Sequence, residues 1–327
     1  MRETRAVPDA NWLEVRKYLR DNRFRLAVEA AGRYPEVPGL AGTPLLTRPE
    51  WVPARPVPLA DVAISLGPAP PLPELPAREY SGLMAELDAP AVFEDRPTYR
   101  LLSASLAGEP RLEFGPGTYF DHIDTGEAAA HEYAAGGATP LRDAVGDPRD
   151  LTRRPANLAI SVVTVRGGRL FLHWRDPARV GHAGGLYQVL PVGVFQATGP
   201  GRDEHDFSLW HCVVREYAEE LLGEPERSDV DYGSWPFAVA MTEALRAGRI
   251  RAECLGLGVD PLTFATDLLV SVTFDDDVFD DLLGGWVAHN DEGAVTEHPF
   301  AAASVEGLPM QAAGAAAVRL ALAAAGQ

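Results

Sequence analysis

Apolar and polar positions alternate most regularly in the second half of the chain. The segment 158–176 contains two apolar runs of strand length joined by Gly167-Gly168, a pair typical of a tight β-hairpin. Residues 187–199 continue with another apolar run, which is interrupted at Gly193. This pattern predicts a hairpin followed by a short strand and a glycine-containing turn.

The next regular segment, 209–222, has the period of an α-helix. At about 100° per residue, Trp210, Val214, Tyr217 and Leu221 fall on one side of that helix. We expect this apolar side to be buried against a mixed sheet.

The other side of the same predicted helix carries three carboxylates. Glu216, Glu219 and Glu220 lie one turn apart, and Arg215 flanks them as a brace. Like charges at this spacing repel one another by about 0.2–0.5 kcal/mol per exposed pair. Such a cluster is most often the solvated acidic face of a surface helix. The alternative is a site for a hard divalent cation, because ions of the Mg²⁺ type take carboxylate oxygens together with water and substrate phosphate.

Downstream of the acidic helix, the pattern predicts further helices and strands. Residues 234–247 predict a helix with Ser234 as its N-cap and Pro236 in its first turn. Two strands are expected within 254–274, and the alanine-rich segment 309–325 predicts a packing helix. Strands and helices in this order favour an α+β fold.

The first half of the chain is less regular. Residues 9–33 predict one long helix, and 78–107 predict a helix followed by a strand. Between them, 35–76 contains too many prolines for long helices, but its dispersed apolar residues indicate a segment that lies extended across a partner surface. We expect an irregular, proline-rich α+β domain, 1–152, packed on a second domain, 153–327.

Polar residues cluster at Asp121, His122, Asp124, Glu127 and His131. Asp124 and Glu127 have the spacing of a capping box, and helix capping explains most of the cluster. A metal site, or a polar pocket contributed to the neighbouring domain, are the alternatives.

The net charge of −18 over 327 residues narrows the classes of partner. It disfavours nonspecific binding to nucleic acid or to an anionic membrane, since both require clustered Lys and Arg. The sequence has no apolar run of about 18 residues and no N-terminal signal-peptide pattern, so we expect no transmembrane helix and a cytoplasmic location. Two cysteines, Cys212 and Cys254, do not make a disulfide framework, and Cys212 is interpreted as a packing residue.

From residue 158 to about residue 300, the chain resembles the Nudix hydrolase family. The family motif is a glycine, a glutamate in the following loop, then R-E-x-x-E-E and a closing glycine. Arg215, Glu216, Glu219, Glu220 and Gly223 match the second half of this motif, with one extra residue before the closing glycine.

The first half of the motif departs from the family pattern. If Gly193 is the motif glycine, the loop before Arg215 is longer than usual, and its glutamate is either Glu204 or missing. The standard spacing instead gives Gly201 as the glycine and Phe207 at the position of the glutamate.

The resemblance implies a Nudix-type α/β/α sandwich with a mixed sheet. It also implies metal-dependent hydrolysis of a phosphoanhydride in a nucleoside-diphosphate-linked small molecule, with specialised metabolism as one setting. Glu219 and Glu220 would be the principal ligands of Mg²⁺ or Mn²⁺, Glu216 a ligand or the catalytic base, and the Gly193 carbonyl a further ligand. Arg215 would anchor the helix by a salt bridge.

Four residues outside the motif are further candidates. Glu292 is a candidate metal ligand or general base in the late part of the domain. Arg175, Arg179 and Arg202 are candidates for binding a phosphorylated substrate, with solvated surface arginines as the alternative interpretation. Whether the chain forms a homodimer is left open.

The sequence is also compatible with two functions other than hydrolysis. The N-terminal half resembles extensions of actinobacterial Nudix-like regulators, which implies a non-catalytic, ligand-sensing module. No pair of DNA-binding helices is visible in the sequence, however, and the charge is unfavourable for DNA. The third function is a Nudix fold recruited to another biosynthetic reaction. The loop glutamate distinguishes a binding module from a hydrolase, because a binding module tolerates the loss of this residue more readily than a pyrophosphatase does.

Overall fold

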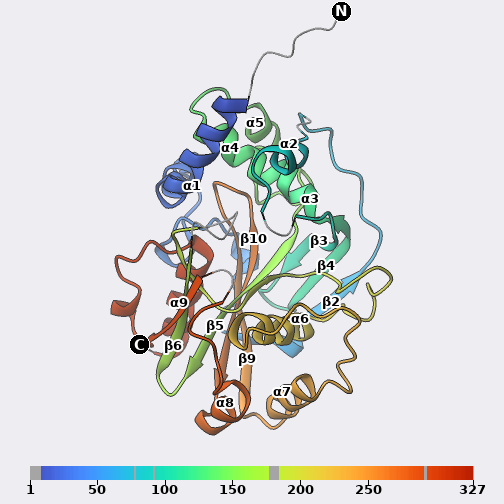
Figure 1. The fold of residues 1–327 in the computed structure, drawn as a ribbon, viewed down its shortest axis with the longest axis vertical. Helices are drawn as coiled ribbons and strands as arrows, with labels where there is room; N and C mark the ends of the chain where they lie inside the picture. Colours follow the sequence, from blue (N-terminus) through green and yellow to red (C-terminus); the bar gives the residue numbers. More distant parts are fainter. Residues whose placement is uncertain (1–8, 77–78, 91–92, 177–183, 291–292, 327) are drawn as a thin grey trace, which may run out of the picture.

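A computed structural model shows a mixed α+β fold (Figure 1). The residues that it describes are 9–76, 79–90, 93–176, 184–290 and 293–326. Arg179 and Glu292 therefore lie outside the described residues. None of the helices in these ranges is both long and apolar enough to cross a membrane.

In the described ranges, the main sheet has eight strands of mixed direction. In spatial order they are β1 (Val57–Pro58), β9 (Ile250–Val259), β10 (Thr266–Phe274), β5 (Leu158–Arg166), β6 (Arg169–Arg175) and β11 (Gly293–Pro299), with β7 (Tyr187–Val189) beside β6 and β8 (Val192–Val194) beside β5. Strands β5 and β10 are parallel, and the other pairs are antiparallel. The predicted hairpin is confirmed, and Gly167 and Gly168 both adopt positive φ in its turn.

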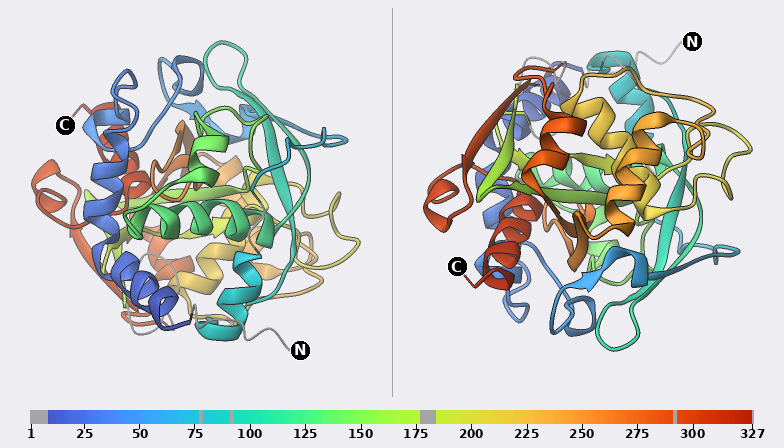
Figure 2. Two further views of the ribbon diagram at one scale, coloured as in Figure 1. Left: turned by 90° about the horizontal axis from the view of Figure 1, so that it is seen from above. Right: turned by 90° about the horizontal axis from the view of Figure 1, so that it is seen from below.

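Helices cover both faces of this sheet (Figure 2). One face packs against α6 (Leu209–Glu216), α7 (Pro236–Arg246) and α8 (Asp276–Leu283). The other face packs against α9 (Ala312–Ala324). The side chains of β5 alternate between these two faces. Ile160 and Val162 pack in the core beneath α6, α7 and α8, and Val163 and Val165 pack in the core beneath α9.

The predicted acidic helix is confirmed as one continuous element. Helix α6 runs into η5, a π-helical turn at Tyr217–Leu221. Val214 and Tyr217 are fully buried, Trp210 is half-buried, and the Tyr217 hydroxyl lies 2.7 Å from Oγ1 of Thr164. The apolar stripe therefore faces the sheet, as the periodicity predicted.

The N-terminal part contains a small sheet and a group of helices. The sheet has the order β2 (Ala63–Leu66), β4 (Arg111–Thr118), β3 (Pro97–Ser105). The helices are α1 (Asp9–Ala31), α2 (Tyr80–Leu87), α3 (Tyr119–His122), the π-helical turn Ile123–Glu127, α4 (Ala128–Ala134) and α5 (Pro140–Val145). Short 3₁₀ turns occur at 40–42, 49–51, 59–61 and 302–304.

The proline-rich segment lies against the C-terminal part of the chain, as expected. Leu46 and Val259 exchange two backbone hydrogen bonds of 2.9 and 2.8 Å, and strand β1 pairs with β9. Leu45 and Trp51 are buried. The dispersed apolar residues thus find cover on the edge of the main sheet, and the two parts share one core.

The capping box predicted at Asp124 and Glu127 is wrong. It is formed instead by Thr118 and Asp121, because Thr118 ends β4 and helix α3 starts directly after it. The carboxylate of Asp124 accepts hydrogen bonds from the backbone and hydroxyl of Ser81.

The predicted cap of α7 is also wrong. Trp235 occupies the N-cap position without a side-chain hydrogen bond. The Ser234 hydroxyl donates to Asp231 instead, at 2.8 Å, within the preceding turn.

Candidate functional site

A cavity of about 930 Å³ lies where the C-terminal end of the acidic helix meets strand β8. Six residues singled out in the sequence line it together: Gly193, Arg215, Glu216, Glu219, Glu220 and Gly223. The fold thus brings the separated glycine and the glutamate-rich helix to one place.

Gly193 lies directly against Glu216. A Cβ added at position 193 would be 2.0 Å from Cδ of Glu216, a distance that no real side chain tolerates. Gly193 pairs with Ile160 of β5, whose side chain faces the acidic helix, so the glycine presents its bare Cα to that helix. Glu220 also reaches β8, since its Oε1 accepts a hydrogen bond of 3.2 Å from the backbone N–H of Val192.

Glu219 sits in a drier part of the cavity. Its pKa is raised to about 7, first by burial and then by the nearby Glu226, while Arg215 and Arg96 oppose these effects. Desolvation disfavours the ionised form of a carboxyl group, which explains the direction. Glu219 therefore exchanges its proton near neutral pH.

Arg215 anchors the helix through hydrogen bonds. Its guanidinium is only 5 % exposed and donates to the Tyr232 hydroxyl at 2.6 Å and to the Gln196 carbonyl at 2.9 Å. The expected salt bridge is not among the contacts of the described residues. The anchoring role is retained, because these bonds tie the helix to the loop that follows β8.

The remaining arginine candidates lie elsewhere. Arg202 does not line this cavity in the described part of the chain; it forms an ion pair of 3.3 Å with the buried Asp206. Arg175, at the end of β6, lines a second cavity instead.

Two arginines in the cavity were missed by sequence reasoning. Arg96 precedes β3 in the N-terminal part and pairs with Glu94 and Glu226. Arg227 pairs with Glu224. No sequence signal marks Arg96, because only the packing of the N-terminal part on the C-terminal part brings it to the acidic helix.

Carboxylates dominate the charge of the cavity. Its described lining includes Glu94, Glu216, Glu219, Glu220, Glu224 and Glu226 on the acidic side and Arg96, Arg215 and Arg227 on the basic side. Across the described residues, no three Asp, Glu, His or Cys side chains converge closely enough to form a metal site as they stand. The alternative loop glutamate, Glu204, is exposed and is not part of the described lining.

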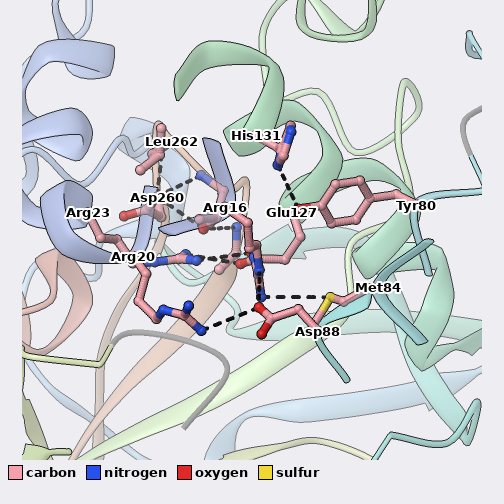
Figure 3. Close-up of polar contacts among 12 residues, drawn as sticks. Arg16, Arg20, Arg23, Tyr80, Met84, Asp88, Glu127, His131, Asp260 and Leu262 are labelled. Carbon is pink, nitrogen blue, oxygen red and sulfur yellow. Dashed lines mark hydrogen bonds and ion pairs between the residues drawn. The ribbon is translucent and has the colours of Figure 1, made fainter. Parts of the chain in front are cut away.

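The polar cluster of the first half of the chain forms a buried network (Figure 3). Glu127 accepts hydrogen bonds from Arg16 at 2.7 Å and from Arg23 at 3.0 Å. The Tyr80 hydroxyl lies 3.1 Å from Nδ1 of His131. These contacts tie α1 to the π-helical turn and α2 to α4, so packing between helices, and not the expected helix capping, accounts for Glu127 and His131. His122 and Glu127 also line the second cavity.

The sequence matches no protein-family model and no curated protein. Support for a function therefore comes from the geometry and chemistry of the cavity.

Proposed function

We propose that this chain is a metal-dependent hydrolase with a Nudix-type α/β/α sandwich. Its substrate would be a nucleoside-diphosphate-linked small molecule, cleaved at a phosphoanhydride. The observation that carries the proposal is the packing of Glu216 on Gly193, with Glu219 and Glu220 in the same cavity. The two distant parts of the suspected motif meet there, although the loop between them has an unusual length.

The oxygen donors of this cavity fit a hard divalent cation. The carboxylates of Glu219 and Glu220 and the carbonyl of Gly193 would hold Mg²⁺ or Mn²⁺, with Glu216 as a further ligand or as the catalytic base. The chemistry that such an ion supplies when bound is neutralisation of charge on the phosphoryl oxygens.

The other steps of the reaction would depend on side chains of the cavity. Glu216, placed against Gly193 beside Glu219 and Glu220, would take the proton from the attacking water. Arg96 and Arg227 lie in the cavity wall, where their guanidinium groups would contact phosphate oxygens. Arg215 holds the helix in place from its buried position.

One observation favours a second function, a non-catalytic ligand-binding module. The loop glutamate Glu204 is exposed and outside the described lining, so one expected carboxylate does not reach the site. A module that only binds its ligand does not need that group.

Release of phosphate-containing products separates the two functions. The wild-type chain is incubated with nucleotide sugars and dinucleotides, with Mg²⁺ or Mn²⁺ and with a chelator, and products are followed by ³¹P NMR. Hydrolysis requires metal-dependent cleavage that Glu220→Gln lowers and that Glu243→Gln, a change on the exposed side of α7, leaves intact. Tight binding without cleavage would favour the binding module.

Cytoplasmic location is part of the same proposal. Cys212 and Cys254 are both free and buried, which agrees with a reducing compartment. Burial raises the pKa of the Cys212 thiol to about 12, so this residue packs and does not act as a nucleophile.

A further inference from the structure

A second cavity, of about 1110 Å³, lies on the other face of the main sheet. Its wall combines α1, the start of α9 and the ends of β5 and β10, and strand β8 separates it from the carboxylate cavity. In Figure 1, α1 and α9 both lie on the left of the molecule, with α1 above α9. Most of the described lining is apolar, and its volume is at the upper end of that of small-molecule sites.

The floor of the cavity is a row of three residues in register across the sheet. Ala159 of β5 is paired with Val194 of β8 on one side and with Asp267 of β10 on the other. Paired residues of neighbouring strands point to the same face, and all three line the cavity. Gly193 lies between Val192 and Val194 in β8, so it faces the opposite side of the sheet, toward Glu216.

Asp267 is a buried carboxylate in this floor, and few groups of the protein neutralise or solvate it. The residue is 6 % exposed, and its carboxylate accepts one hydrogen bond in the described structure, from the Ser161 hydroxyl at 2.8 Å. No arginine, lysine or histidine of the described residues forms an ion pair with it. Burial raises its pKa to about 7, with Ser161 opposing and Asp260 adding to this effect.

The other charged groups with known contacts in the wall are already paired. Arg16 and Arg23 bind Glu127, and Arg319 donates to backbone carbonyls. Asp260 accepts hydrogen bonds from the turn that follows it. Asp267 differs from Asp260 in that no backbone N–H group donates to its carboxylate in the described structure.

Asn157 also lines this wall, but its side-chain oxygen is closed off from the cavity. It is 8 % exposed, and its amide nitrogen donates to the Thr118 carbonyl at 2.7 Å. Its Oδ1 is buried and accepts no hydrogen bond in the described structure. A buried acceptor with few donors is costly, and Asp267 is the acceptor of this wall that favours a ligand bringing a donor.

We infer that this cavity binds an organic molecule that joins an apolar body to a protonated amine, with the amine at Asp267 and the apolar part along β8 and α9. The apolar lining supplies the affinity for the body, and the buried carboxylate supplies the preference for a cation. This inference does not depend on hydrolysis, because the cavity lies across β8 from the carboxylate site.

Three fluorescent probes of one chemical series test it: dansylcadaverine, which carries an amine, the neutral dansylamide, and the anionic dansylglycine. Fluorescence titration of the full chain should show that dansylcadaverine binds at least about tenfold more tightly than the other two, as expected for a charge-assisted hydrogen bond of about 1.5–3 kcal/mol. Equal affinity for the three probes, or binding of none, would overturn the inference.

Two variants assign the binding to this cavity. Asp267→Asn keeps the shape of the side chain and should remove the preference for the amine, whereas Asp281→Asn, on the exposed side of α8, should retain it. Ala315→Trp, at the half-buried wall of the cavity, should weaken all three probes. A preference that survives Asp267→Asn would place the amine elsewhere and reject the site. Glu220→Gln should leave probe binding unchanged, whatever its effect on hydrolysis.

Discussion

Gly193 and Glu216 are in contact across the interface between strand β8 and helix α6. An added Cβ at position 193 would lie 2.0 Å from Cδ and 2.1 Å from Oε1 of Glu216. Gly193 does not adopt a positive φ, so the requirement for glycine is steric and not conformational. The position of the carboxylate therefore depends on the absence of a side chain on the neighbouring strand.

Gly193→Ala should displace Glu216 and damage the site more than the fold. We expect turnover to fall by about 100-fold, because a shift of about 1 Å in a reacting group has effects of this size. The free energy of unfolding should fall by about 1–3 kcal/mol, as for other overpacked positions. Gly199→Ala is the matched control, since a Cβ there would meet no atom within 4 Å. Unchanged turnover in Gly193→Ala would remove Glu216 from the mechanism.

Addition of Mg²⁺ or Mn²⁺ should raise the melting temperature. A ligand at 100 times its Kd stabilises the folded state by about 2.7 kcal/mol, which corresponds to roughly 5–10 °C for a domain of about 150–250 residues. Glu220→Gln should abolish most of this gain with little loss of fold, because the side chain is half-buried and faces away from the apolar stripe. Differential scanning fluorimetry with and without metal measures the effect. A gain that persists in Glu220→Gln and is lost in Glu243→Gln would place the metal elsewhere.

The elements of the C-terminal half could be predicted from the sequence because their signals are local. The glycine pair of the β5–β6 hairpin and the apolar stripe of α6 each involve residues that are close together in the chain. The burial of Val214 and Tyr217 followed directly from the helical period.

The rest of the site depends on contacts between distant residues. Arg96 reaches the cavity only because the N-terminal part packs on the C-terminal part, and nothing in its local sequence indicates this. The caps of α3 and α7 were assigned incorrectly, since several polar residues within a few positions can each serve as a cap and the preceding strand or turn decides. The buried pairing of Glu127 with Arg16 was likewise invisible to patterns of spacing.

Metal affinity should increase with pH through the titration of Glu219. The pKa of this carboxyl group is raised from 4.5 to about 7, so at pH 6 it is mostly protonated and a cation must displace the proton. Affinity should rise by up to about tenfold per pH unit between about pH 5 and 7 and level off above. Isothermal titration calorimetry in buffers of different ionisation enthalpy measures both the affinity and the proton released. Glu219→Gln should flatten the profile and release no proton; a slope that persists in this variant would assign the proton to another group.

Replacement of Arg215 should destabilise the protein through lost hydrogen bonds. Arg215→Met leaves the Tyr232 hydroxyl and the Gln196 carbonyl without their buried donor. We expect a loss of about 3 kcal/mol in the free energy of unfolding, measured by urea denaturation. Arg246→Met, at the exposed end of α7, should stay within about 0.5 kcal/mol of the wild type. A neutral effect of Arg215→Met would mean that the helix is held by its apolar face alone.

Asp267→Asn should stabilise the protein, and the gain should grow with pH. The pKa of Asp267 is raised from 3.8 to about 7 by burial, so the folded state holds a proton that the unfolded state has already released. The contribution of this group to the free energy of unfolding is therefore most favourable below about pH 4, and it falls as the pH rises toward about 7. The asparagine variant has no such proton and avoids this loss. At pH 8 we expect it to be more stable by about 2–4 kcal/mol, since one pKa unit corresponds to about 1.4 kcal/mol. Urea denaturation at four pH values from 5 to 8 tests this, with Asp281→Asn as the exposed control. Parallel profiles for the wild type and Asp267→Asn would show that the carboxyl group is ionised or partnered in the folded protein, in which case the floor of the second cavity is already neutralised.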